Sequence, residues 1–324
     1  MTRQRAAIPF LLFSSVLILS FNALLDVSAA AQSVVRTADP VKRGMKEGDI
    51  PRTVKVTDNV YTYEDFHAGD EKFTTTNMFV VTRDGVLLCD AQGNVPMTKG
   101  LVDAIKKITP QPIKYVVIAS DHGDHTGGNA ALPTGVTYII HPTSKAILDK
   151  QAAAPNARPG AWTLPANAEL VSDHKTITMG GETFQILFLG RAHTGGDLAV
   201  YLPKEKILFM SEIFLNRVFP AMRSAYPSEW LGALAKAEKM DVKTYIPGHG
   251  FTEDSTVSKE ELHNYDKAMH AVIAEATRLH NAGMPVDEAI KQANFGEYGS
   301  WTLAKSQAPI AIRKVYDELD GKLK

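Results

Sequence analysis

Residues 119–128 of the chain read ASDHGDHTGG and directly follow IKYVVI at 113–118, a run rich in β-branched residues. The run predicts a buried strand over 113–120, and the positions that follow it hold two carboxylates and two imidazoles. Carboxylate and imidazole side chains together suit zinc, iron or manganese. The stretch therefore predicts a metal site where this strand ends.

Three later strand ends carry side chains of the same kinds. His193 lies in GRAHTGGD at 190–197, Glu212 ends ILFMSE at 207–212, and His249 lies in PGHG at 247–250. Glycine beside a ligand lets the backbone turn sharply and leaves room for an ion and its water. No thiolate accompanies these residues, so we expect a catalytic site with open positions instead of a closed structural zinc site.

The pattern resembles the metallo-β-lactamase superfamily of hydrolases, whose signature His-x-His-x-Asp-His is followed by a His, an acidic residue or Cys, and a final His. The resemblance spans roughly residues 54–250, and HTGGDLAVYLP and YIPGHG match the usual surroundings of the later ligands. Asp90 falls where the family keeps an Asp that supports the ligand loop. The resemblance implies an α/β fold, a four-layer αβ/βα sandwich with the metal site along one edge of its two sheets.

The resemblance also implies two metal positions. In the first position, the resemblance implies that His122 and His193 bind the metal. In the second position, the implied ligands are Asp124, His125 and His249. Glu212 would bridge both ions or complete the second position, where the family more often has Asp. Ser120 stands in place of the family's first His, and a neutral hydroxyl is a poor zinc ligand. We therefore expect one strongly bound zinc ion and a weaker second one, with iron or manganese as alternative metals.

Hydrolysis of a small-molecule substrate by a metal-activated water is the implied chemistry, with Asp124 and Glu212 as catalytic residues that orient the water or act as general base. The substrates considered for this exported hydrolase are esters, lactones, thioesters and β-lactams, and loops 64–76, 152–168 and 216–228 are expected to decide among them. No Lys follows Glu212 within a few residues to hold a β-lactam carboxylate. The alternative is a non-catalytic periplasmic accessory or binding protein that retains the fold.

Several other residues are assigned to structural or surface roles. Arg191 and Arg217 are interpreted as surface charges, with a substrate carboxylate as the alternative partner. Asp121 is interpreted as a solvated loop acid and His141 as a cap at a strand end. Trp162 either lines a substrate entrance or packs in a loop. The histidines expected to be exposed or on a helix face are His67, His174, His263, His270 and His280.

The first part of the chain resembles a targeting segment. Arg3 and Arg5 precede an apolar run from about residue 8 to 25, and AAA at 29–31 offers a cleavage site. We expect residues 1–31 to be a signal peptide, the mature protein to be periplasmic or secreted, and no stable membrane anchor to remain after cleavage. No other segment is long and apolar enough to span a bilayer.

The remaining organisation follows from composition and spacing. Residues 32–52 are expected to form an N-terminal arm, 53–257 the metallo-β-lactamase-like domain, and 258–324 a C-terminal helical extension packed on it, which begins at a capping box, SKEE, at 258–261. Helices are predicted over 96–108, 143–151, 228–240, 258–282, 285–293 and 307–322. We expect the apolar residues of this extension to lie mostly in the core or at the surface between the subunits of a homo-oligomer.

Charge and cysteine content restrict the partners. The chain of 324 residues carries 35 Lys+Arg against 36 Asp+Glu, without a basic stripe, so no nucleic-acid partner is expected. Cys89 is the single cysteine, which rules out an intrachain disulfide, and its apolar neighbours indicate a packed thiol.

Overall fold

The computed structural model, which describes residues 2, 35–67, 72–155 and 162–323, contains a sheet of twelve strands, ten of which pair along one path while the first two branch from it. Almost all of the predicted signal peptide, residues 1–31, lies outside the described residues. The first half of the sheet contains β3 (Thr74–Thr82), β4 (Gly85–Cys89), β5 (Ile113–Ile118), β6 (Thr137–Ile140) and β7 (Glu169–Leu170) on the path, and β2 (Val60–Phe66) and β1 (Arg52–Lys55) on the branch that begins at β3. Here β4 to β7 pair in parallel, and β1 to β4 pair antiparallel.

The second half of the path consists of β8 (His174–Met179), β9 (Glu182–Leu187), β10 (Ala199–Leu202), β11 (Ile207–Leu215) and β12 (Thr244–His249). Strands β11 and β12 pair in parallel, whereas β8 to β11 pair antiparallel. The two halves join between β12 and β3, where His249 pairs with Thr75. A residue predicted to bind metal therefore lies at the junction of the two halves.

The two halves are packed face to face. Successive strand residues point to opposite faces, and in β4 Leu87 and Cys89 join the apolar cluster shared with β8 to β12, while Val86 and Leu88 join the cluster under the first helix. In β11, Phe209 faces the shared cluster and Leu208 the opposite one. Strands buried on both faces are typical of sheets covered by helices. The predicted αβ/βα sandwich is confirmed.

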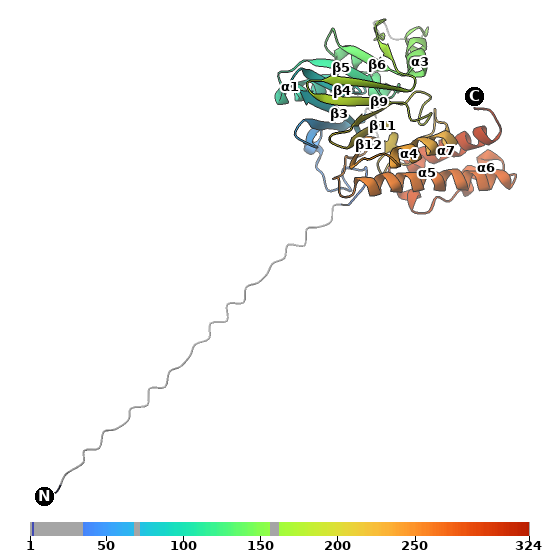
Figure 1. Cartoon of the computed structure of the whole chain (residues 1–324). Helices are drawn as coiled ribbons and strands as arrows, with labels where there is room; N and C mark the ends of the chain where they lie inside the picture. Colours follow the sequence, from blue (N-terminus) through green and yellow to red (C-terminus); the bar gives the residue numbers. More distant parts are fainter. Residues whose placement is uncertain (1, 3–34, 68–71, 156–161, 324) are drawn as a thin grey trace. The chain divides into compact units, whose positions relative to one another are not determined.

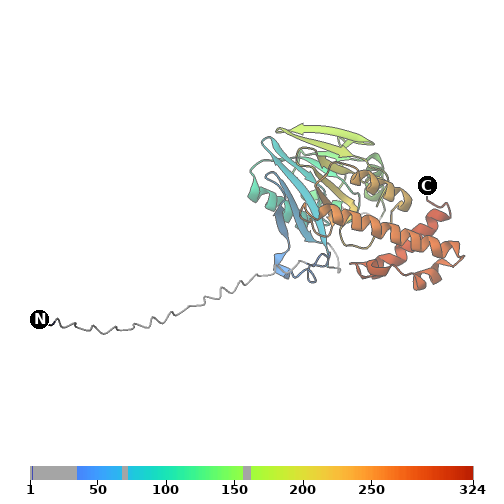
Figure 2. The same cartoon turned by 60° about the horizontal axis from the view of Figure 1, so that its bottom comes forward.

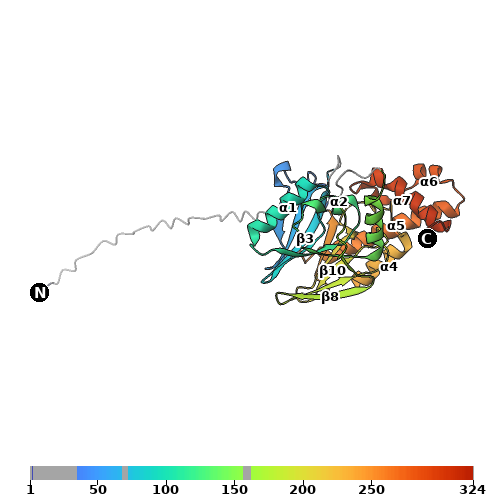
Figure 3. The same cartoon turned by 90° about the horizontal axis from the view of Figure 1, so that it is seen from above.

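Helices cover the two outer faces of this sandwich (Figure 1). On the first half lie α1 (Val95–Ile108), α2 (Gly123–Thr126) and α3 (Pro142–Ala152); on the second lie α4 (Pro227–Glu238), α5 (Ser258–Asn281), α6 (Val286–Gln292) and α7 (Ala304–Leu319). Figure 3, the view from above, places α1 on the opposite side of the strands from α5, α6 and α7. Helix α1 buries Leu101, Val102 and Ile105 at the predicted spacing.

The C-terminal helices complete the core of the second half. Helix α5, drawn in orange, lies over the strands of that half (Figure 2) and buries Leu262, Tyr265, Met269 and Val272 along one face. Helix α7 adds further buried apolar side chains to the same cluster, among them Ile312. The C-terminal extension is therefore packed on the sandwich by a continuous apolar cluster.

The capping box predicted at residue 258 does not form. Helix α5 begins at Ser258 itself, and Val257 before it makes no side-chain cap. The Ser258 hydroxyl instead accepts a hydrogen bond from the backbone N–H of Tyr245 at 2.8 Å and donates one to its carbonyl oxygen at 3.2 Å. A tertiary contact to β12 has replaced the local cap.

The N-terminal arm is tied to the body of the protein by charge pairs. Arg43 forms hydrogen bonds of 2.6 and 2.8 Å with Glu253, and both side chains are nearly buried. Arg36 contacts Glu260 and Glu261 at the start of α5. Among the helices of the described residues, we find none with the length and apolar content needed to cross a membrane.

Candidate metal centre

The motif loop after β5 is held in place by Asp90, which follows β4. Its Oδ1 accepts a hydrogen bond of 2.7 Å from the N–H of Ala119, and its Oδ2 lies 3.0 Å from His125 Nδ1. Asp90 Oδ2 also accepts a 2.7 Å hydrogen bond from the Ser211 hydroxyl. This fully buried carboxylate therefore links the motif loop to β11, which is the supporting role that the resemblance implied.

Glu212 follows a β-bulge in β11. The register with β12 shifts around Ser211, whose φ of 45° lies in the left-handed region, and bulges of this kind redirect the side chains beside them. Gly248 of β12 approaches so closely that a Cβ there would lie 2.5 Å from the carbonyl carbon of Ser211. The glycine before His249 therefore allows β11 and β12 to bring Glu212 and His249 together.

Four predicted ligands converge to form what we call the second donor group. Its members are Asp124, His125, Glu212 and His249, and one ligand atom of each lies within 4.8 Å of all the others. His249 Nε2 is 3.1 Å from Asp124 Oδ2 and 3.3 Å from Glu212 Oε1. His125 Nε2 is 3.6 Å from Asp124 Oδ2. Side chains from three separate parts of the chain, Asp124 with His125, Glu212 and His249, thus point to one place.

The first donor group consists of His122, His193 and Glu212. His193 Nε2 lies 3.0 Å from His122 Nδ1 and 3.0 Å from Glu212 Oε1. The other oxygen, Glu212 Oε2, lies 3.2 Å from His122 Nδ1. The Glu212 carboxylate is therefore shared between the two groups.

Ser120 is fully buried and contacts the shared acid directly. Its hydroxyl donates a very short hydrogen bond to Glu212 Oε2 and accepts one of 3.3 Å from the N–H of His122. The residue that replaces the family's first imidazole therefore acts as a hydrogen-bond donor to the acid that both groups share.

Three of the imidazoles have their outward nitrogen engaged. His249 Nδ1 donates to the carbonyl oxygen of Thr74 at 3.0 Å, His125 Nδ1 faces Asp90, and His122 Nε2 lies 3.2 Å from the Ser224 hydroxyl. Such partners fix the ring orientation and leave the opposite nitrogen directed at the centre, as in metal-binding histidines.

The charges of the cluster are mutually stabilised. Burial by itself would lower the pKa of His249, but hydrogen bonds to Asp124 and Glu212 outweigh burial and raise it to about 10. Burial likewise would raise the pKa of Glu212, but facing histidines, His193 and His122 first, hold it well below its usual range. The carboxylates of Asp124 and Glu212 therefore stay ionised because positive charge lies beside them, here on the histidines.

The donor set fits a zinc ion. Zinc at 2.0–2.1 Å from each ligand in a tetrahedron places neighbouring ligand atoms about 3.3 Å apart, and the second donor group shows spacings from 3.1 Å, between His249 and Asp124, to 4.0 Å, between His125 and Glu212. Imidazole and carboxylate ligands also suit iron and manganese. The second donor group offers four ligand residues, whereas the first offers three.

The two groups open into a cleft of about 200 Å³. Its lining is completed by Phe73, Leu215, Val218, Ala221, Arg223, Leu303, Gln307 and His67. Loops 64–76 and 216–228 contribute to this lining as expected. The C-terminal extension, whose helices were expected to be mostly core or oligomer surface, also contributes to the lining through Leu303 and Gln307.

His67 was wrongly expected to be an exposed or helix-face residue. It follows β2, stacks on Phe73 with ring centroids 4.4 Å apart, and places Nε2 3.4 Å from Asp124 Oδ2. The contact depends on the β2–β3 pairing, which brings this end of the hairpin next to His249. A signal was present in the sequence, since His67 lies in a loop already expected to border the substrate.

One other assignment is wrong and three are confirmed, namely the cap at His141 and the surface charges of Arg191 and Arg217. Asp121 is buried, not solvated. His141 caps the start of α3, where its Nδ1 accepts the N–H of Thr143 at 3.1 Å. Arg191 pairs with Glu229 and Arg217 with Glu261, so neither is left to hold a substrate carboxylate.

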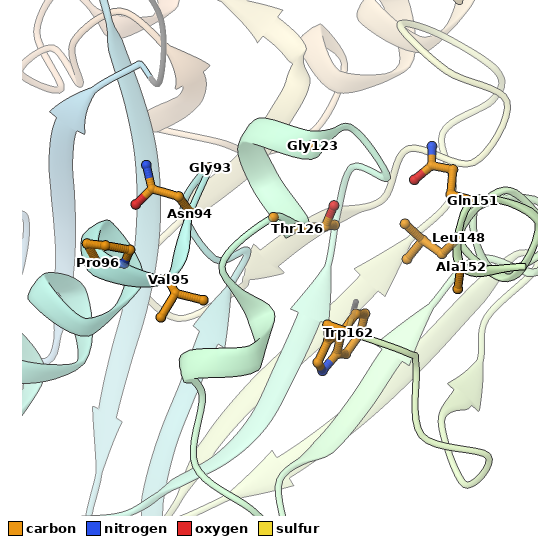
Figure 4. A pocket seen from close by; sticks show the side chains of 11 residues that line it. Gly93, Asn94, Val95, Pro96, Gly123, Thr126, Leu148, Gln151, Ala152 and Trp162 are labelled. Carbon is orange, nitrogen blue, oxygen red and sulfur yellow. The ribbon is translucent and has the colours of Figure 1, made fainter. Parts of the chain in front are cut away.

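A larger cleft of about 590 Å³ lies beside the motif helix (Figure 4). It is lined by Asn94 and Pro96 near α1, by Gly123 and Thr126 of α2, by residues of α3, and by Trp162. No described residue in its lining is ionisable. Trp162, from loop 152–168, therefore faces this second cleft and packs near Tyr138, with ring centroids 5.3 Å apart.

Comparison with known proteins places this geometry in context. A family model described as the metallo-beta-lactamase superfamily matches residues 72–249. The alpha subunit of 2,4-dinitroanisole O-demethylase from Nocardioides sp. is 22% identical over 63% of this chain and 57% of its own length. Metallo-beta-lactamase IND-1 from Chryseobacterium indologenes is 28% identical over 47% of this chain and 60% of its own. The chain thus matches less than two thirds of either relative.

A solved structure resembles more of the chain. The sec-alkylsulfatase from Pseudomonas sp. superposes with a TM-score of 0.66 at 16% identity, over 86% of this chain and 51% of that protein. At this identity the likeness concerns the fold.

Proposed function

This chain belongs to the metallo-beta-lactamase superfamily, and we propose that it is an exported, zinc-dependent hydrolase acting on an ester, lactone, thioester or β-lactam. The observation that carries the proposal is the convergence of Asp124, His125, Glu212 and His249 on one point at the edge of a cleft. Two carboxylates and two imidazoles gathered in one buried place form the ligand set of a divalent cation, which would balance the two carboxylate charges when the histidines are neutral.

Zinc bound there would supply a Lewis acid that polarises the scissile group and lowers the pKa of water. The chain's own contribution begins with Asp124, which is the most exposed member of the second donor group and lines the cleft. Its pKa is held well below the usual range, because burial is outweighed chiefly by the charge of His125 and by hydrogen bonds from His249 and His67. As a carboxylate it accepts a hydrogen bond from the attacking water and orients it.

We propose one strongly bound ion and a weaker second one. The first donor group lacks the imidazole that Ser120 replaces, so its only nitrogen ligands are His122 and His193. Glu212 is shared with the second group and cannot give both oxygens to the first group without loosening the second. The proposed export rests on the segment at 1–31 and is tested by sequencing the N-terminus of the mature protein.

The names of the relatives widen the set of substrates to be tested. They describe a β-lactamase, an O-demethylase subunit and an alkylsulfatase, so sulfate esters and aryl methyl ethers belong beside the carbonyl substrates. The mature protein is purified, its metals are counted, and hydrolysis of each class is measured with and without added zinc.

We expect about one zinc per chain and zinc-dependent turnover of at least one class. An Asp124→Ala variant should lose both, while Asp58→Ala, at a fully exposed turn position, should lose neither. Full zinc content without turnover of any class would favour the accessory protein, and absence of zinc, iron and manganese together would refute the metal centre itself.

A further inference from the structure

Arg223 is a cationic side chain in the wall of the metal cleft. It lies in the segment between β11 and α4, is exposed, and lines the same cleft as His122, Asp124 and Glu212. Within the part of the chain that the structure describes, Arg223 forms no hydrogen bond and no ion pair. It differs in this respect from Arg191 and Arg217, which are both held by glutamates.

The charge balance of the cleft leaves Arg223 unmatched. Asp124 and Glu212 are the only acids in the described lining, and their two negative charges balance one divalent ion. The guanidinium therefore adds one net positive charge beside the ion, and a second ion would add more. Such a cleft attracts an anion and repels a cation.

The groups around Arg223 fit a small organic anion. Ser224, the next residue, carries a hydroxyl that already orients His122, and Gln307 of α7 adds an amide to the lining. The apolar part of the wall consists of Phe73, Leu215, Val218, Ala221 and Leu303. The cleft of about 200 Å³ is smaller than the roughly 300–1,000 Å³ typical of drug-sized ligands.

We propose that the substrate carries an anionic group, separate from the bond to be cleaved, which the Arg223 guanidinium binds while the apolar wall holds the carbon skeleton. The inference rests on the proposed function, because it assumes that the scissile group lies at the metal centre. Guanidinium binds a carboxylate or sulfate through two parallel hydrogen bonds, so Arg223 decides between charged and neutral substrates.

Binding of simple dicarboxylates tests the proposal without any turnover. Malonate, succinate and glutarate, and the monoamide of each, are titrated calorimetrically into the zinc-loaded protein. Each pair shares one carboxylate for the metal and differs only in the charge of the other end. Because the three dicarboxylates differ in length, the one that binds most tightly indicates the distance between the ion and the Arg223 guanidinium.

We expect at least one dicarboxylate to bind about tenfold more tightly than its monoamide, the ratio for one charged hydrogen bond at the weaker end of its range. Arg223→Gln should abolish that preference, and Arg223→Lys should keep part of it. Arg83→Gln, a change at an exposed arginine outside the cleft lining, should keep all of it.

Equal binding of dicarboxylate and monoamide at all three lengths would overturn the proposal, as would a preference that survives Arg223→Gln. Zinc is counted in every sample. A protein that holds zinc but shows no preference dependent on Arg223 refutes only this inference, whereas a protein that holds no zinc refutes the proposed function.

Discussion

The hydroxyl of Ser120 donates a hydrogen bond to Oε2 of Glu212, the one acid that both donor groups share. The same oxygen lies 3.2 Å from His122 Nδ1. Serine at this position therefore removes a ligand from the first donor group and at the same time fixes the carboxylate that serves the second. The proposed weaker binding at the first position and the ordered carboxylate at the second would then have one cause.

Changing Ser120 to histidine should restore the missing imidazole. We expect the Ser120→His protein to hold close to two zinc ions per chain, against about one in the wild type, as counted by elemental analysis after dialysis. Ser120→Ala is the matched control, because it removes the hydroxyl without adding a ligand. It should keep about one ion but bind it roughly tenfold more weakly, from the loss of a charged hydrogen bond. A folded Ser120→His protein with an unchanged zinc count would contradict the assignment.

Changing Asp90 to asparagine should weaken zinc binding without touching a ligand. Asp90 orients His125 at 3.0 Å and holds the motif loop through Ala119. Loss of such a supporting carboxylate costs about 10–100-fold in metal affinity, which competition with a chelator measures. Asp58→Asn, at a fully exposed turn, is the control. Equal zinc affinity of Asp90→Asn and wild type would show that this carboxylate does not support the centre.

The metal-free protein should lose stability as the pH rises. The pKa of His249 is raised from 6.5 to about 10, so protonated His249 stabilises the fold. That contribution is fully present below about pH 6.5 and is lost as the pH approaches about 10. We expect the melting temperature of the metal-free protein to fall between about pH 7 and 10, and that of the zinc-loaded protein to fall less. Calorimetry of the metal-free protein that showed a constant or rising melting temperature would count against the charged cluster.

The C-terminal extension should be necessary for stability. Ile312 of α7 is fully buried in the cluster that α7 shares with α5 and β11. Ile312→Ala is expected to lower the free energy of unfolding by about 2–5 kcal/mol, as measured by urea denaturation. Leu319→Ala, at an exposed position of the same helix, should change it by less than about 0.5 kcal/mol. Similar small effects at both positions would mean that α7 is only loosely attached.

The ligands were predictable because their signals are local. Asp124 and His249 each lie beside a glycine near the end of an apolar strand, and His125 directly follows Asp124; strand ends at one edge of a sheet meet in space. The apolar periodicity also located the helices to within a few residues, as at α1 and α4.

The features that were missed depend on contacts between distant segments. His67 approaches Asp124 only through the β2–β3 hairpin, and Gln307 reaches the cleft only because α7 packs beside β11 and α4. The serine at the start of α5 had the correct local pattern for a cap, but a hydrogen bond to Tyr245 took precedence. Sequence periodicity carries no information on such pairings.

The position of the ion itself is the most direct test. Crystals of the zinc-loaded mature protein are measured at wavelengths on both sides of the zinc absorption edge, so that anomalous scattering locates zinc alone. The account predicts a strong peak about 2.0–2.2 Å from ligand atoms of Asp124, His125 and His249, with Glu212 beside it. A strong peak bonded only to His122 and His193, or one outside both donor groups, would contradict it.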